Sequence, residues 1–307
     1  MSNKAKNNEL DLFDLLNILW IRKLTIFIFF LLFLTSSLYY AFSIPDEYTS
    51  KVLLAPNSED KSSSMSSLGA LGGVAALAGA NIKSGSNKIS EGLAIIKSLD
   101  FFKDLLVITE DDLKVALIAA KGWDPKLNEL IIDPELYDKN KKTWIRKKPD
   151  QLGKIIPSAQ ETHLKFLERV SITEDVDTGL ISISITFYSP YMAKNWLDNI
   201  VKLINKKVRD YDVNEAKNSN LYLYKTINET DLPDVRETIA SLIQDQVKTI
   251  MLAESNPQYL FKVIQTSYAS EKKSGPKRLL ILLSGSLLGV LFGMIFVLSK
   301  SIFLNRD

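Results

Sequence analysis

The 307-residue chain has no cysteine and only one histidine. The absence of cysteine excludes disulfide bonds, thiolate metal sites and a cysteine nucleophile. The single histidine, His163, has no second histidine beside it as a metal ligand, and it shares the apolar face of a predicted helix with Phe166. We therefore interpret it as a packed side chain. The formal net charge is only +2, which gives no indication of nucleic-acid binding.

Common catalytic motifs are also missing. The sequence has no GxxxxGK[ST] phosphate loop, no HExxH zinc motif and no GxSxG nucleophile elbow. The carboxylate pairs Asp111-Asp112 and Glu174-Asp175 are sequence neighbours, which do not face one substrate on a helix or strand. A glycosidase pair built from distant residues stays open. Nine residues follow Leu298, fewer than a kinase or signalling domain needs. We predict a protein that is not an enzyme and holds no cofactor or metal.

Long uncharged runs are the strongest feature that is present. The stretch from Leu279 to Leu298 has twenty residues without a charge, which as a helix is about 30 Å long and matches a bilayer core. Within it, Gly285, Gly289 and Gly293 recur at every fourth position. They share one stripe of a helix, where a second backbone can approach closely. We interpret them as a transmembrane packing site, although glycine is also simply frequent in membrane helices.

A second uncharged run, Leu24 to Phe42, is nineteen residues long and predicts another membrane-spanning helix. A cleavable signal peptide is the weaker interpretation, because the run exceeds a typical signal core and Ala41-Phe42-Ser43 is a poor cleavage site. The partner of the glycine stripe is then this helix of the same chain or a helix of a neighbouring protomer.

The charges around the first span predict its orientation. Basic residues precede it and acidic residues follow it: Lys4, Lys6, Arg22 and Lys23, then Asp46 and Glu47. This bias predicts a cytoplasmic N-terminus, and two spans return the C-terminus to the cytoplasm. Basic residues before the second span argue the other way, but the first span usually dominates. The middle of the chain is therefore expected outside the cytoplasm.

Strand and helix patterns between the spans predict an α+β domain. Tyr48–Ala55 and Tyr259–Thr266 read as the first and last strands, each close to a span, which predicts a mixed sheet at the membrane. Ser171–Asp175 and Leu180–Tyr188 form a hairpin through Asp177-Thr178-Gly179. Alternation in the second of these strands places one set of side chains on the buried face: Ile181, Ile183, Ile185 and Phe187.

Two long helices follow this hairpin. Ser189-Pro190 is a helix start with a serine cap, and no breaker occurs before Leu232-Pro233, which allows a helix of about 38 residues, nearly 60 Å long. Asp231 is expected to cap the second helix, which continues to Asn256-Pro257. The pair predicts an antiparallel helical hairpin that projects as a stalk.

Capping patterns predict shorter helices elsewhere. Lys88–Leu106 has helical spacing with Ser98 as a cap inside it, and Thr109 with Asp112 has the spacing of a capping box. We expect Gly122 to end that helix and Trp123-Asp124-Pro125 to turn. Another capping box is formed by Ser158 and Glu161.

Two segments have no clear role. The Gly/Ala-rich tract 62–85 is either a mobile loop or a segment that packs in an oligomer or lumen. The basic loop 139–148 carries six positive charges around Trp144. We favour a solvated loop over a surface for an acidic sugar or lipid headgroup.

The order of these features resembles the Wzz-type chain-length determinants, the polysaccharide co-polymerases of Gram-negative inner membranes. The resemblance spans nearly the whole chain and follows DLFDLLNILW, the Pro45–Pro56 strand, the Gly/Ala-rich tract, EGLAIIKSLDFF, GLISISITFYSPYMAKNWLDNIV, LFKVI and the Lys272–Arg278 segment before the glycine-rich span. The family implies a membrane-proximal base, a long periplasmic helix and a ring-shaped homo-oligomer. Some relatives carry a kinase domain, and the missing phosphate loop predicts that this chain does not. It also implies a role in setting the length of the O-antigen of lipopolysaccharide, which a separate polymerase in the same membrane makes.

The predicted organisation follows. It comprises a cytoplasmic segment 1–23, a transmembrane helix 24–42, a periplasmic domain 43–278, a transmembrane helix 279–298 and a cytoplasmic tail 299–307. In the periplasmic domain, 43–188 and 257–270 form the base and 189–256 the hairpin. The residues expected next to the membrane are Pro45, Pro276, Lys277 and Arg278.

The sequence is compatible with three functions. They are a chain-length regulator, a polysaccharide or capsule export co-polymerase of the same architecture, and the input domain of a sensor, which would need an output module. Direct contact with a lipid-linked glycan is left open.

Overall fold

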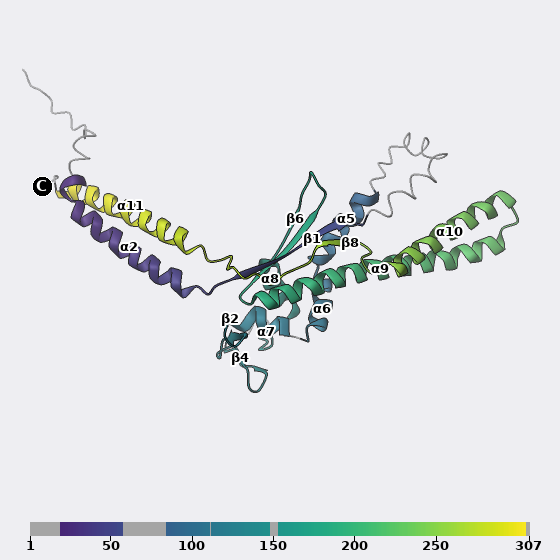
Figure 1. The fold of residues 1–307 in the computed structure, drawn as a ribbon, viewed down its shortest axis with the longest axis horizontal. Coiled ribbons are helices and arrows are strands. Elements are labelled where there is room, and N and C mark those ends of the chain that lie inside the picture. Colours follow the sequence, from purple (N-terminus) through teal and green to yellow (C-terminus); the bar gives the residue numbers. More distant parts are fainter. Residues whose placement is uncertain (1–18, 58–83, 111, 148–152, 305–307) are drawn as a thin grey trace, which may run out of the picture. The chain divides into compact units, whose positions relative to one another are not determined.

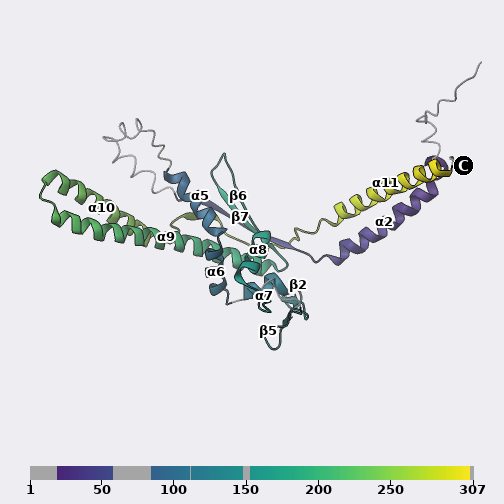
Figure 2. The same ribbon diagram turned by 180° about the vertical axis from the view of Figure 1, so that it is seen from behind.

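The computed structural model describes residues 19–57, 84–110, 112–147 and 153–304. The Gly/Ala-rich tract 62–85 lies outside the described residues, except for its last two positions. The chain forms two compact units, Met1–Asp46 with Lys273–Asp307, and Glu47–Lys272. Figure 1 and Figure 2 label their elements from two sides.

A four-stranded sheet is the centre of the Glu47–Lys272 unit. Its strands are β1 (Tyr48–Pro56), β6 (Val170–Glu174), β7 (Ile181–Phe187) and β8 (Phe261–Gln265), in the order β6-β7-β1-β8. All three pairings are antiparallel, so the expectation of a mixed sheet was wrong in this detail. The predicted hairpin and its alternation are confirmed, because every second side chain of β7 is buried, starting at Ile181.

The first and last strands, β1 and β8, are neighbours in the sheet. Beyond β8 the chain continues antiparallel to β1, where the Ser50 hydroxyl donates a hydrogen bond of 2.9 Å to the Tyr268 carbonyl. The chain therefore enters this unit at Glu47 and leaves it at Lys272 from the same end of the sheet.

The long helix α9 (Pro190–Glu229) covers one face of this sheet. The Ser189 hydroxyl accepts from the Met192 amide at its N-terminus, which confirms the predicted start. Its first half contributes the buried side chains that pack on the sheet, including Trp196, whose ring lies 4.5 Å from that of Phe187. Beyond Val208 only Ala216 and Asn220 are buried.

Helix α10 (Pro233–Ser255) folds back along α9 and completes the predicted hairpin. The expectation that Asp231 caps α10 was wrong. The residue before the helix is Leu232, which makes no side-chain cap. Pro233 fixes the helix start one residue after Leu232, so Asp231 lies too early in the chain to serve as the cap.

Four shorter helices complete the core: α5 (Ser84–Ile96), α6 (Leu99–Ile108), α7 (Asp112–Ala119) and α8 (Ala159–Arg169). Ser98 and Ser158 cap α6 and α8 as predicted, accepting from the amides of Phe101 and Glu161. His163 is packed as expected, with its ring against Phe102 and Nε2 3.0 Å from the Lys97 carbonyl oxygen.

The region after α7 differs from the prediction. Gly122 lies inside a strand, β2 (Ala120–Asp124), which pairs with β3 (Glu129–Ile132), and β4 (Tyr137–Asp138) pairs with β5 (Thr143–Trp144). The chain reverses after Trp123, where the Asp124 carboxylate accepts from the Lys126 amide and Asn128 adopts a φ of 53°. These short strands have too few alternating residues to be recognised in the sequence.

The basic loop also contains a buried cation. Arg146 is only 8% exposed and forms an ion pair with Glu161, at 2.5 Å between Nη1 and Oε1. Its other hydrogen bonds go to the carbonyls of Lys154 and Ile155. The solvated-loop interpretation is therefore wrong for Arg146, and Glu161 pairs with it across the fold.

A polar cluster joins α5, α9 and the chain before β8. The Asp212 carboxylate accepts from the Tyr259 hydroxyl at 2.6 Å and lies 2.6 Å from Lys88 Nζ. Burial, together with the bond to Asp212, raises the pKa of Tyr259 to about 12. Burial alone would lower the pKa of Lys88, but Asp212 and Tyr259 outweigh it and the pKa is raised.

These shifts predict a loss of stability at alkaline pH. The pKa of Tyr259 is above the ordinary value of 10.0, so the folded state holds a proton that the unfolded state releases. The stabilisation is complete below pH 10 and is lost as the pH rises through about 12. We expect the unfolding midpoint of the wild type to fall more steeply than that of Tyr259→Phe over this range. If the unfolding midpoints of the wild type and Tyr259→Phe fell equally with pH, the raised pKa assigned to Tyr259 would be contradicted.

Candidate functional site: a glycine-lined pair of apolar helices

The other unit contains two apolar helices, α2 (Lys23–Ser43) and α11 (Arg278–Leu304). Both are long and apolar enough to span a membrane, and they pack against each other along their length. Most of their large apolar side chains are exposed in the folded chain, as expected for helices that face lipid.

The three glycines of the predicted stripe all face α2. A Cβ atom at Gly285 would lie 2.5 Å from the Cβ of Ser37, and one at Gly293 would lie 3.0 Å from the Cα of Ile26. At Gly289 it would lie 2.8 Å from the Cβ of Phe33 and 3.0 Å from the Phe29 carbonyl oxygen. The missing side chains therefore allow close approach and van der Waals packing of the two backbones.

Contacts from α2 complete this interface. The Ser37 hydroxyl donates a 2.7 Å hydrogen bond to the Ile281 carbonyl. Phe33 stacks on Phe292 with ring centroids 5.4 Å apart, and Phe29 lies 5.1 Å from Phe296. None of these residues was predicted from the sequence as part of the interface. The signal for Ser37 was its polarity within an apolar run, since hydroxyls in membrane helices often bond across to a neighbour.

The predicted membrane-proximal residues lie at one end of this pair. Pro45 follows α2, while Pro276 and Lys277 precede α11, and their carbonyls accept from amides in its first turn. Arg278 begins α11 and forms an ion pair with Asp46, at 2.9 Å between Nη2 and Oδ1. Its Nε donates to the Ala41 carbonyl at 3.2 Å. Arg278 thus joins the end of α2 to the start of α11.

We expect Arg278→Ala to loosen this junction. It removes both the ion pair and the bond to Ala41, whereas Lys273→Ala removes only a longer contact of 3.5 Å to Asp46. Because the Arg278 pair is partly exposed, the expected cost is about 1 kcal/mol. Thermal unfolding of the full chain in detergent tests this. An Arg278→Ala midpoint no lower than that of Lys273→Ala would contradict the assignment.

Fold and site together define a class of protein. In it, two apolar helices that pack against each other flank an α+β domain in the sequence, and this domain contains a long helical hairpin. Residues 8–107 match the family model described as "Wzz: Chain length determinant protein". This stretch contains α2, β1, α5 and nearly all of α6. The matched residues make up about a third of the chain, and the match agrees with the resemblance seen in the sequence.

Two solved structures are similar to the chain. One is a full-length bacterial polysaccharide co-polymerase, with 12% sequence identity and a TM-score of 0.40, covering 97% of this chain and 99% of that one. The other is a fragment of WzzB, a polysaccharide co-polymerase from Salmonella Typhimurium, with 8% identity and a TM-score of 0.35, covering 75% of this chain and 100% of that one. No curated protein matches the sequence.

Proposed function

We propose that this chain regulates the length of a bacterial surface polysaccharide, the O-antigen of lipopolysaccharide. In this proposal it acts as a homo-oligomeric ring in the inner membrane, beside a separate polymerase that makes the glycosidic bonds. The observation that carries the proposal is the family match over residues 8–107, which begins before the first apolar helix and extends into the folded domain.

The arrangement of the chain supports a two-span topology. The apolar helices α2 and α11 flank the folded domain in the sequence, and the exits at Glu47 and Lys272 leave the sheet from the same end. We propose that 24–42 and 279–298 span the membrane, that both termini are cytoplasmic, and that 43–278 is periplasmic. Pro45, Pro276, Lys277 and Arg278 then lie at the membrane surface.

The proposed mechanism is control of contact time. The oligomer sets how long the polymerase and the growing chain stay together, and therefore how many repeats are added. In this account Gly285, Gly289 and Gly293 act in assembly, because they set the distance between α2 and α11. The chemistry of chain growth belongs to the polymerase.

Deleting the gene and restoring it on a plasmid tests this function. Lipopolysaccharide from the two strains is separated by electrophoresis. We expect the deletion strain to lose the preferred cluster of O-antigen lengths and the plasmid to restore it. An unchanged cluster in the deletion strain would refute the proposal.

A further inference from the structure

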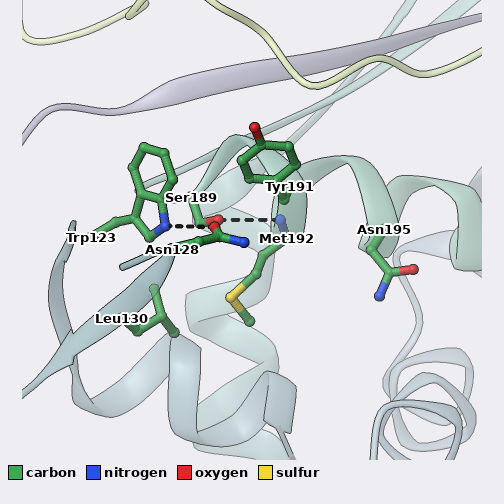
Figure 3. A pocket seen from close by; sticks show the side chains of 7 residues that line it. All are labelled: Trp123, Asn128, Leu130, Ser189, Tyr191, Met192 and Asn195. Atoms are coloured by element: carbon green, nitrogen blue, oxygen red, sulfur yellow. Dashed lines mark hydrogen bonds between the residues drawn. The ribbon is translucent and has the colours of Figure 1, made fainter. Parts of the chain in front are cut away.

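An open pocket lies where the β2–β3 hairpin meets the start of α9, within the Glu47–Lys272 unit (Figure 3). Its volume is about 320 Å³, near the lower end of the range for small-molecule sites. Neither the family match nor the paired helices assigns a role to this pocket.

Two aromatic side chains form its walls. The ring centroids of Trp123 and Tyr191 lie 6.1 Å apart, with their planes at 61°. Tyr48 packs edge-on against Trp123 at 5.6 Å, which holds the indole in place from another direction. Tyr191 lies in the first turn of α9 and is 56% exposed. The pocket therefore offers aromatic surface that the fold itself does not bury.

Polar groups line the pocket beside the two rings. The Trp123 indole N–H donates to Asn128 Oδ1 at 3.1 Å, which orients the amide so that its nitrogen points toward Met192 (Figure 3). The Ser189 hydroxyl accepts from the Met192 amide and is 2% exposed. Within the described parts of the chain, neither the Asn128 amide nitrogen nor the Ser189 hydroxyl donates a hydrogen bond to another group. The amide nitrogen of Asn128, which is exposed, thus remains available to a ligand as a donor.

The lining has no charged side chain. A phosphate or carboxylate would find no cation here, and an ammonium group would find no carboxylate. Aromatic walls combined with neutral hydrogen-bonding groups suit a ligand that is apolar on its faces and rich in hydroxyls at its edges. A sugar ring in the pyranose form has this chemistry, because its C–H faces stack on aromatic rings while its hydroxyls accept from amides and hydroxyls.

We propose that this pocket binds one pyranose ring of the polysaccharide. The identity of that polymer rests on the proposed function, but the chemistry of the pocket does not. The exposed Tyr191 ring stacks on the sugar, Trp123 contacts its edge, and the Asn128 amide donates to its oxygens. The chain then contacts the growing glycan directly, in addition to contacting the polymerase.

Binding of the purified full-length chain to delipidated O-polysaccharide from the host strain tests this pocket by calorimetry. We expect Tyr191→Ala and Asn128→Gly each to weaken binding, Tyr191→Ala by about tenfold because a stacking wall is lost. Glycine is compatible with the φ of 53° at Asn128, so the backbone is preserved. The matched control is Tyr222→Ala, an exposed tyrosine further along α9, which should bind as the wild type does. Inorganic phosphate should not bind.

The possible outcomes separate the pocket from the proposed function. If the wild type restores the preferred O-antigen lengths in the deletion strain but does not bind the polysaccharide, the pocket proposal is wrong and the function stands. Equal binding by the wild type and Tyr191→Ala also overturns the pocket proposal. If Tyr191→Ala changes the oligomeric state and polysaccharide binds neither protein, the pocket is a contact between copies. If the wild type binds but does not restore lengths, the function fails and the pocket stands.

Discussion

Replacing Gly289 by leucine should separate α2 from α11 and abolish control of polysaccharide length. The Cβ atom alone would lie 3.0 Å from the Phe29 carbonyl oxygen and 3.0 Å from the Phe30 Cα. These are backbone atoms and cannot rotate away, so the helices must move apart. Overpacking of this kind costs about 1–3 kcal/mol.

A cysteine pair measures this separation directly. The chain has no cysteine, so Phe29→Cys with Phe296→Cys introduces the only two thiols, at positions whose rings are 5.1 Å apart. We expect an intramolecular cross-link in the otherwise wild-type chain and a strong reduction when Gly289→Leu is added. The matched control is Ser284→Leu, an exposed position on the same helix, which should leave both cross-linking and length control intact. Normal cross-linking and regulation by Gly289→Leu would contradict the packing role.

The second large effect is expected at Asn205, a buried residue of α9. Its Oδ1 accepts from the amides of Leu260 and Phe261, at 2.8 Å each, and its Nδ2 donates to the carbonyls of Val201 and Phe261. Asn205→Leu leaves two amides unpaired next to side chains that are 4% and 0% exposed. Each buried unpaired group costs about 1–3 kcal/mol. We therefore expect a loss of about 2–6 kcal/mol, seen as a lower midpoint in thermal unfolding of the full chain.

Asn220 provides the matched control on the same helix. It is also buried, but its Oδ1 has no hydrogen-bond partner in the described part of the chain. Asn220→Leu removes an unsatisfied polar atom and should leave stability unchanged or slightly raised. If Asn205→Leu unfolds at the same temperature as Asn220→Leu, the bonds from Asn205 do not hold β8 to α9.

Local signals in the sequence identified much of the fold. The alternation at Ile181–Phe187, the start at Ser189-Pro190 and the caps at Ser98 and Ser158 all act within a few residues, and the structure contains each of them. The two long apolar helices could be predicted because the thickness of a bilayer sets the length of uncharged sequence that a spanning helix needs.

Long-range partners could not be predicted in the same way. Arg146 looked like one more charge in a basic loop, and only folding brings Glu161 against it. Asn205 could not be recognised from its neighbours in the sequence, because its partners Leu260 and Phe261 lie more than fifty residues further along the chain. Trp123 was expected in a turn, but the pocket that it lines also needs the start of α9. The spacing of the glycines was visible in the sequence, but the choice of α2 as their neighbour required coordinates.

A strain that lacks the gene gives the most direct test of the claim that this chain regulates polysaccharide length. The measurement combines the amount, the location and the length of its O-polysaccharide. The proposed function predicts polymer at the cell surface in near-normal amount but without its preferred length. Loss of the polymer, or its retention inside the cell with unchanged length, would contradict a length regulator and favour a role in synthesis or export.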